Sequence, residues 1–418
     1  MKYLAGFGCA VFLVFGASAG AQTPAPLTWP EVRQRFEQQN PTLLAGKLNI
    51  EESKAQEITA YLRPNPSLAL LADQFDPFPG GPPHGALAFL LASATVSYLH
   101  ERAHKRELRL ESAKGATAIS ISGQADLERA LLFNLRGAFV GTLQAKAVLR
   151  VARDNLSYWD RVLRVSRDRF QAGDLAQVDL DRLELQRVQF EADLQTAEVN
   201  LRTAKIQLLM LLNDRTPVEQ FDVSGSYDFS EELASLDEFR RLAQENRPDL
   251  KAAQQAVDKA RTDHKLAVAN GSTDPTFAFD VGRNPPIDQY IGVGVSIPLR
   301  IFDRNQGEKL RTQLDIDRNQ RLLDATQAQV LSDVDSAHAL VNSNLILLRP
   351  YKAKYLQQAV RVRETVRFAY EHGGASLLDF LSAENDYRSV QLNYANLVGA
   401  YLMAAAQLNL AVGREVIP

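Results

Sequence analysis

Residues 276–297 read TFAFDVGRNPPIDQYIGVGVSI, two runs in which apolar residues alternate with small or polar ones. A turn containing Pro285-Pro286 separates the runs. Alternation with a period of two predicts β-strands with one apolar face, and two such runs around a turn predict a hairpin. The apolar face is a candidate surface for lipid, formed by Phe277, Phe279, Val281, Ile291, Val293 and Val295.

Short sequence signals recur in the two halves of the chain. Residues 40–43 match 247–250, residues 65–67 match 274–276, and residues 170–173 match 370–373. Such pairs predict an internal repeat, in which each half reads helix, hairpin, long helix, tight turn, long helix. In the first half, residues 92–98 alternate clearly and residues 67–75 hardly at all. The loop at 76–85 is rich in proline and glycine, as an exposed turn should be.

The first 21 residues have the pattern of a secretory signal peptide. Lys2 precedes an apolar run at 4–15, and small residues at 17–21 offer a cleavage site. The only cysteine, Cys9, lies inside this apolar run, so we expect neither lipidation nor disulfides in the mature chain. No later segment holds 18 consecutive apolar residues, and we therefore expect no transmembrane helix.

These signals divide the chain into a signal peptide, two repeats, a connecting segment and a tail. The predicted bounds are 1–21 for the signal peptide, 22–213 for the first repeat (hairpin at about 66–99, tip near 173), 214–237 for the connecting segment, 238–413 for the second repeat (hairpin at about 275–299, tip near 373) and 414–418 for the tail.

The remainder of each repeat is predicted to be helical and unusually long. Residues 101–169 contain no proline and are laced with charge, which predicts a helix about 100 Å long standing in water. After each tight turn, apolar residues recur at alternating spacings of three and four, from Leu180 to Leu211 and from Phe380 to Ala411. Both are heptad seams, interrupted in the first repeat by Arg187. Pro350 interrupts the ascending helix of the second repeat and is expected to kink it.

Four strands are too few to close a barrel. In lipid an open sheet edge leaves backbone groups unpaired, and closure needs about eight strands or more. Two copies would give a barrel filled by side chains, whereas three would give one wide enough for water. The glycine and serine residues opposite the apolar face suit an aqueous bore, so we favour a homotrimer over a dimer. The fold class is mainly α, with long antiparallel coiled coils and four strands per protomer contributing to a twelve-stranded trimeric β-barrel.

Five stretches in order carry a family resemblance. They are QQNPTLLAGKLNIEESKAQEITAYLRPNPSL (38–68), RFQAGDLAQVDLDRLELQRVQFEADL (169–194), NRPDLKAAQQAVDKA (246–260), VGVSIPLRIFDRNQG (293–307) and HGGASLLDFLSAENDYRSVQLNYANL (372–397). As an ordered set they resemble the TolC-like outer-membrane efflux family, and within it the CzcC-like heavy-metal branch. The resemblance implies a trimeric channel in outer-membrane lipid with a helical periplasmic tunnel. It also implies two partners, a periplasmic adaptor (membrane fusion protein) and an inner-membrane pump of the resistance-nodulation-division (RND) type.

The tight turns are candidate docking tips for that adaptor. Gly173 and Gly373 permit the positive φ of a tight helix–turn–helix, although a glycine there is equally an ordinary helix stop. The residues concerned are Gly173, Asp174, Leu175, Gly373, Gly374, Ala375 and Ser376.

Asp179 and Asp379 are candidates for an acidic periplasmic gate. Each lies six residues past its tip glycine, and threefold symmetry would gather six carboxylates that attract cations. The family resemblance supports Asp379 in particular. The alternative is that each aspartate simply meets the dipole at the start of a helix.

One motif offers a different function. His100-Glu101-Arg102-Ala103-His104 fits the H-E-x-x-H pattern of a zinc metalloprotease. Charged residues follow it directly, and no second cluster supplies a third ligand, so we interpret it as a polar segment near the membrane boundary. We expect no enzyme, no catalytic residue, no cofactor and no bound metal.

The net charge of −3 argues against nucleic acid as a partner, and no basic motif with interleaved aromatic residues appears, so we expect no nucleic-acid binding. The transported substrate is not readable from the residues, and a type I secretion duct is an open alternative.

Overall fold

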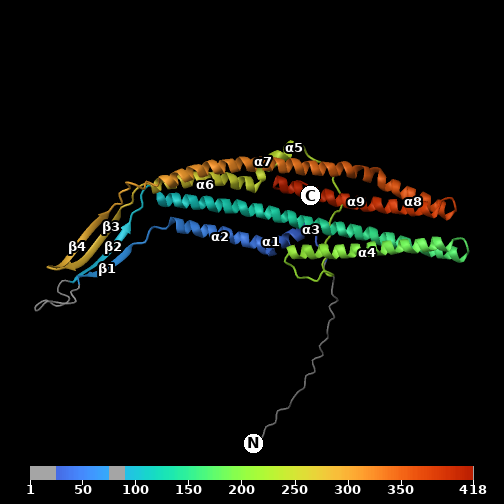
Figure 1. Ribbon diagram of the computed structural model, residues 1–418, viewed down its shortest axis with the longest axis horizontal. Coiled ribbons are helices and arrows are strands. Elements are labelled where there is room, and N and C mark those ends of the chain that lie inside the picture. The colour runs from blue at the N-terminus through green and yellow to red at the C-terminus, as the bar shows by residue number, and fades with distance from the viewer. Residues whose placement is uncertain (1–24, 75–89, 418) are drawn as a thin grey trace, which may run out of the picture.

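The structure, a computed structural model, describes residues 25–74 and 90–417 (Figure 1). Within these ranges the molecule is long and thin, with a small sheet at one end and helices running along the remainder. The predicted signal peptide, Cys9 and the proline-rich loop at 76–85 lie outside the described residues.

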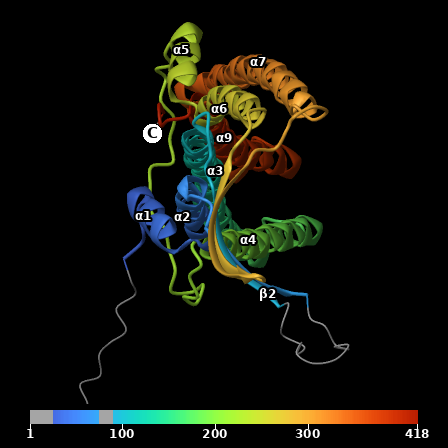
Figure 2. The ribbon, with the colours of Figure 1, turned by 90° about the vertical axis from the view of Figure 1, so that its left-hand side faces the viewer.

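The sheet has four antiparallel strands in the order β1-β2-β3-β4. Their bounds are Ser67–Asp73 for β1, Leu91–Leu99 for β2, Thr276–Asn284 for β3 and Ile287–Ser296 for β4. The pairing of β2 with β3, from Leu99 opposite Thr276 to Ala92 opposite Arg283, joins the two halves of the chain into one sheet. β1 and β4 are the outer strands, and Figure 2 shows that the sheet is strongly curved.

Strand register explains the weak alternation of the first strand. Leu68 and Leu70 lie opposite Val96 and Ala94 of β2, and these lie in turn opposite Phe279 and Val281 of β3. Both leucines therefore share the face of the alternating apolar residues. Leu71 lies on the other face, opposite Ser93, and this leucine is what blurred the pattern in the sequence.

The helices form two long hairpins and two shorter pairs. They are α1 (Trp29–Gln39), α2 (Pro41–Tyr61), α3 (Lys105–Gln171), α4 (Gln177–Leu211), α5 (Leu236–Asn246), α6 (Pro248–Asn270), α7 (Gln306–Pro350), α8 (Leu356–Glu371) and α9 (Leu377–Val412). α3 packs along α4, α6, α2 and α9, and α7 packs along α6 and α9. The prediction of a mainly helical chain with a small antiparallel sheet is confirmed.

The heptad seams are buried as their spacing predicted. Leu183, Phe190 and Phe380 gather around Trp159 of α3, which is fully buried and donates its indole N–H to the Leu183 carbonyl at 2.9 Å. Arg187, the exception in the seam, reaches Asp160 of α3 at 2.7 Å, so an ion pair continues the contact there.

Pro350 marks a break in the ascending helix of the second repeat. α7 ends at Pro350, and a π-helical turn, Tyr351–Tyr355, precedes α8. Proline lacks the N–H that the i→i−4 ladder needs, and π-turns are a common way to absorb such a defect. α3 runs unbroken past the corresponding position, Arg150, so the two repeats differ here.

α9 is long and apolar enough by composition to cross a membrane. Of its most apolar stretch, however, 61% is buried inside the molecule, because α9 lies against α3, α7 and α8. Its apolar character is thus accounted for by packing among helices.

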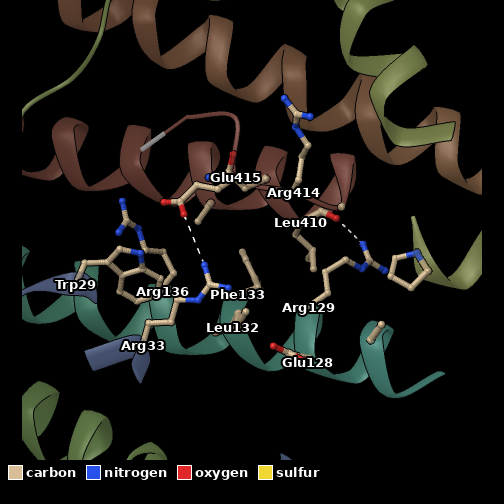
Figure 3. Close-up of a pocket in the computed structure, with 15 residues that line it drawn as sticks. Trp29, Arg33, Glu128, Arg129, Leu132, Phe133, Arg136, Leu410, Arg414 and Glu415 are labelled. Carbon is tan, nitrogen blue, oxygen red and sulfur yellow. Dashed lines mark hydrogen bonds and ion pairs between the residues drawn. The ribbon is translucent and has the colours of Figure 1, made fainter. Parts of the chain in front are cut away.

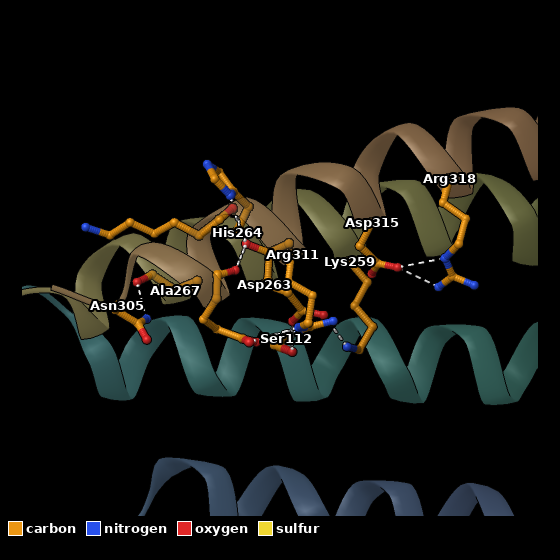
Figure 4. Close-up of polar contacts among 12 residues, drawn as sticks. Ser112, Lys259, Asp263, His264, Ala267, Asn305, Arg311, Asp315 and Arg318 are labelled. Carbon is orange, nitrogen blue, oxygen red and sulfur yellow. Dashed lines mark hydrogen bonds and ion pairs between the residues drawn. The ribbon is translucent and has the colours of Figure 1, made fainter. Parts of the chain in front are cut away.

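Polar contacts fasten the helices together near the sheet (Figure 4). Asp263 of α6 accepts hydrogen bonds from Ser112 of α3 and from Lys259, and His264 contacts the Thr312 hydroxyl of α7 at 2.9 Å. Asn305, the residue before α7, donates its amide to the Ala267 carbonyl at 2.7 Å. These bonds fix the start of α7 against the end of α6.

Candidate functional site: strand face, junction and tips

All six predicted lipid-facing residues lie on one face of the sheet. Phe277, Phe279 and Val281 stand directly opposite Val295, Val293 and Ile291. Val293 is 86% exposed, and the other five are exposed as well. Because no helix covers this face within the described part of the chain, its apolar side chains need an apolar environment from outside.

The opposite face is mostly small or polar, with Leu71, Leu99 and Tyr290 as its large side chains. It presents Ser93, Thr95, Ser97, Asp280, Gly292, Gly294 and Ser296. Gly292 lies opposite Asp280, and a Cβ on it would come within 2.5 Å of the carboxylate, so glycine makes room for a charged group. A carboxylate on this face is compatible with water and incompatible with lipid.

Aspartate at Val293 is expected to destabilise membrane insertion by about 2 kcal/mol or less, since acids cost less than Arg or Lys in this position. Cysteines at Val293 and its five companions should be shielded from a water-soluble maleimide in membranes. A cysteine at His104, whose side chain is 88% exposed beyond the strands, serves as the labelled control. Free labelling at Val293 would show that this face is in water.

A buried ion pair joins the sheet to the helices, and sequence reasoning missed it. Lys105, the first residue of α3, is only 3% exposed and is paired with Asp274, just before β3. Asp274 also accepts from the Arg102 N–H at 2.8 Å, and His100 N–H donates to the Pro275 carbonyl at 2.9 Å. We call this set of contacts between 100–105 and 274–275 the inner junction. The only signal for it was the repeated Asp/Asn-Pro pair before each hairpin.

The H-E-x-x-H segment does not have the geometry of a zinc site. α3 begins only at Lys105, and His104 is its N-cap, with a left-handed φ of 56°. The two histidines are therefore not on successive turns of one helix, as shared zinc ligation would require. Glu101 is engaged by the Arg109 guanidinium instead. Among residues 25–74 and 90–417, no group of three or more His, Cys, Asp or Glu is placed to hold a metal ion.

The two predicted tips lie at the end of the molecule far from the sheet (Figure 1). Gly173 and Gly373 have φ of +84° and +76°, the left-handed region that favours glycine. Most residues of both turns are exposed, and Leu175 is partly buried against the cluster around Trp159. The tip after α8 is held by Ser376, whose hydroxyl caps α9.

Asp179 and Asp379 both fall in the first turn of a helix, α4 and α9. The Asp379 carboxylate accepts from the Ser376 hydroxyl at 2.7 Å and from its backbone N–H at 3.1 Å. These hydrogen bonds hold the pKa of Asp379 below its usual value, so it is ionised at neutral pH. Asp179 lies 3.8 Å from the Arg182 guanidinium of its own helix. The geometry thus accounts for Asp379 as the partner of Ser376 in a capping box at the start of α9, and the role of either acid in a gate stays a prediction.

If these acids form a gate, the double variant Asp179→Ala with Asp379→Ala should lower cation selectivity and weaken block by trivalent cations in planar-bilayer recordings. Six carboxylates around one axis would focus the field there. Asp174→Ala, which removes an exposed acid of the same tip, is the matched control. Parental conductance and block in the double variant would assign both aspartates to helix starts alone.

A buried carboxyl group ties α9 to α3 above the tips. Glu384 is 5% exposed and accepts from the Tyr158 hydroxyl at 2.7 Å, while the Arg363 guanidinium of α8 stacks on the Tyr158 ring. Burial raises the pKa of Glu384 above its usual value, which Tyr158 and Arg363 only partly oppose. Sequence reasoning passed over Glu384, although an acid directly after the seam residue Ala383 was a detectable signal.

At mid-length, a cavity of about 300 Å³ lies between α1, α3 and the end of α9 (Figure 3). Arginines and two aromatic side chains dominate its lining; Arg136 stacks over the Trp29 ring at 4.5 Å, and Arg129 donates to the Leu410 carbonyl. These contacts fasten the two ends of the described chain to α3. We therefore assign these contacts a structural role in the helical body.

The fold is shared with solved outer-membrane channels. The structure of CusC superposes with a TM-score of 0.76 over 92% of this chain and 91% of that chain, at 16% sequence identity. An exposed apolar sheet carried on long helical hairpins is therefore the TolC-type fold that this chain shares with such channels.

Sequence comparison finds relatives among outer-membrane efflux proteins. Residues 240–414 match the family described as Outer membrane efflux protein. The chain is also similar to the Cobalt-zinc-cadmium resistance protein CzcC of Cupriavidus metallidurans, with 21% identity over 94% of this chain and 91% of CzcC. It is 26% identical to the Pyoverdine export outer membrane protein OpmQ of Pseudomonas aeruginosa over 78% of this chain and 69% of OpmQ. The chain is thus an efflux channel of the outer membrane, and its residues 240–414 are those that match the outer membrane efflux protein family.

Proposed function

We propose that the chain forms a homotrimeric duct that exports substrates from the periplasm across the outer membrane. The observation that carries this proposal is the four-stranded sheet, with an exposed apolar face and outer strands β1 and β4 that have no further strand beside them in the described part of the chain. In lipid each unpaired backbone group costs several kcal/mol, so the edges must meet strands of other copies. Three copies of four strands give a twelve-stranded barrel with room for water.

An exposed apolar stripe on α4 supports association between copies in the helical body as well as at the sheet. Val178, Leu185, Val199 and Ile206 of α4 are all more than half exposed and recur at multiples of seven residues. This stripe is distinct from the buried seam of the same helix. Heptad spacing is the pattern by which helices pack in coiled coils, so another helix is its natural partner.

Native mass spectrometry in detergent is expected to find a trimer. The physical reason is the pair of open edges, which a monomer would leave unpaired in lipid. A stable, folded monomer in membranes would contradict the barrel and the duct together. A dimer would contradict the water-filled bore.

The duct is proposed to work with a periplasmic adaptor and an inner-membrane pump of the RND type, and to export divalent metal cations. The likeness to CzcC, which extends over nearly the whole of both chains, supports this substrate class. Deleting the gene should sensitise cells to zinc, cadmium or cobalt. Sensitivity limited to organic compounds, or loss of a secreted protein, would redirect the proposal to drug export or to a type I secretion duct.

A further inference from the structure

Four segments connect strands to helices at the periplasmic end of the sheet: 62–66, 100–104, 271–275 and 297–305. The two that flank the central strands, 100–104 after β2 and 271–275 before β3, bind each other in the inner junction described above. They are polar in sequence, reading HERAH and GSTDP. Each copy of the chain therefore forms the inner junction by itself, because both of the segments that make it belong to the same copy.

Large apolar side chains are exposed beside the two edge strands. Leu299 and Phe302, in the segment after β4, are 80% and 90% exposed. Leu62, in the segment before β1, is 60% exposed, and Ile58, in the last turn of α2, is 69% exposed. If these apolar side chains served only to contact lipid, segments 100–104 and 271–275, at the same end of the sheet, should have apolar side chains too. Because the inner segments 100–104 and 271–275 contain no large apolar side chain, the cover of the exposed ones is expected to be whatever pairs with the edge strands.

The repeat indicates how the edges meet. His104 and Asn305 are equivalent N-caps, both left-handed, with φ of 56° and 61°, and Asp274-Pro275 corresponds to Asn65-Pro66. The segment after β2 contacts the one before β3. By the same relation, the segment after β4 would contact the one before β1 of another copy.

Two positions that are charged in the first repeat are both apolar in the second. Glu101 lies three residues before one cap and Phe302 three before the other; Arg109 and Leu310 each lie five after. Glu101 and Arg109 form an ion pair beside the inner junction. In the second repeat both positions are apolar and exposed, as expected for a surface that an apolar segment covers.

We propose that a second copy of this chain docks residues 58–66 against residues 297–305, burying Leu299 and Phe302 against Ile58 and Leu62. This outer junction rests on the proposed trimer and adds to it a specific apolar contact. It would lie directly below each of the strand pairs between copies. There it seals the boundary between barrel and helical body, as the Lys105–Asp274 pair does within a copy.

Disulfide trapping tests the contact in the full chain, in outer membranes and in a Cys9→Ser background that leaves only introduced cysteines. Leu62→Cys combined with Phe302→Cys, or with Leu299→Cys, should give reducible covalent dimers and trimers upon oxidation. Either cysteine alone should give none. Phe302→Cys with His104→Cys is the matched control, because His104 is equally exposed but follows an inner strand.

Native mass spectrometry of the same variants separates two kinds of failure. A trimer that forms without the cross-link would overturn the outer junction and leave the proposed duct unaffected. The same holds if lipid, and not a second copy, shields the Phe302→Cys thiol from a water-soluble maleimide. A monomer would overturn the duct itself.

Phe302→Asp supplies a second measurement that does not depend on cysteine geometry. It should lower the temperature at which the trimer dissociates on gels, compared with Phe302→Leu. Equal dissociation temperatures in the two variants would count against the junction.

Discussion

Replacing Gly373 by tryptophan is expected to abolish export while trimer formation and membrane insertion stay intact. A Cβ on Gly373 would meet nothing within 4 Å, so the indole would project outward from the tip. It would stand in the surface that we propose for the adaptor. The barrel is at the opposite end of the molecule and should not sense the change (Figure 1).

The measurement is metal resistance of a deletion strain that expresses the variant, together with native mass spectrometry of the purified protein. Gly373→Ala is the matched control, because it imposes the same φ of +76° on a residue with a Cβ but adds no bulk. The strain of a left-handed residue costs only about 1–2 kcal/mol, so Gly373→Ala should retain most of the resistance. Full resistance with tryptophan would mean that nothing docks at this tip.

Removing the Arg247 side chain is expected to destabilise the helical body by about 3 kcal/mol, because breaking a buried ion pair leaves its partners uncompensated. Arg247 is 5% exposed and donates to Asp249 at 2.6 Å, to Asp333 of α7 at 2.8 Å and to the Ala411 carbonyl of α9 at 3.2 Å. One side chain thus links α6, α7 and the end of α9. Thermal unfolding of Arg247→Ala, followed by helical circular dichroism, measures the loss.

Arg241→Ala is the control, since that arginine forms exposed ion pairs within α5 and should leave unfolding unchanged. A melting curve of Arg247→Ala that matches this control would show that the network contributes nothing.

The Arg247 network also predicts a dependence on pH. Burial alone would raise the pKa of Asp249, but hydrogen bonds and charge from Arg247, with Arg129 nearby, outweigh it and hold the pKa below its usual value. A lowered pKa means that Asp249 contributes stability at neutral pH. That contribution is lost as the pH falls through its ordinary pKa toward the folded one. Arg247→Ala should flatten this acid-side loss.

Local patterns in the sequence determined the elements and their order. The period of two in residues 276–297 specified a hairpin with one apolar face, because successive side chains on a strand point to opposite faces. The heptad spacing after each tip specified buried seams, and the structure buries Leu183 and Phe380 there. Positive φ at Gly173 and Gly373 followed from tight turns between long helices.

Only the tertiary structure decided which distant residues meet. Lys105 and Asp274 are 169 positions apart, and nothing local marks them as partners. Leu71 masked the alternation of β1 until pairing with Ser93 placed it on the polar face. The H-E-x-x-H pattern lost its zinc geometry because α3 begins one residue after it. The spacing of residue types predicts which side chains share a face of a helix or strand. Which element packs against that face depends on the path of the whole chain, and local spacing does not specify that path.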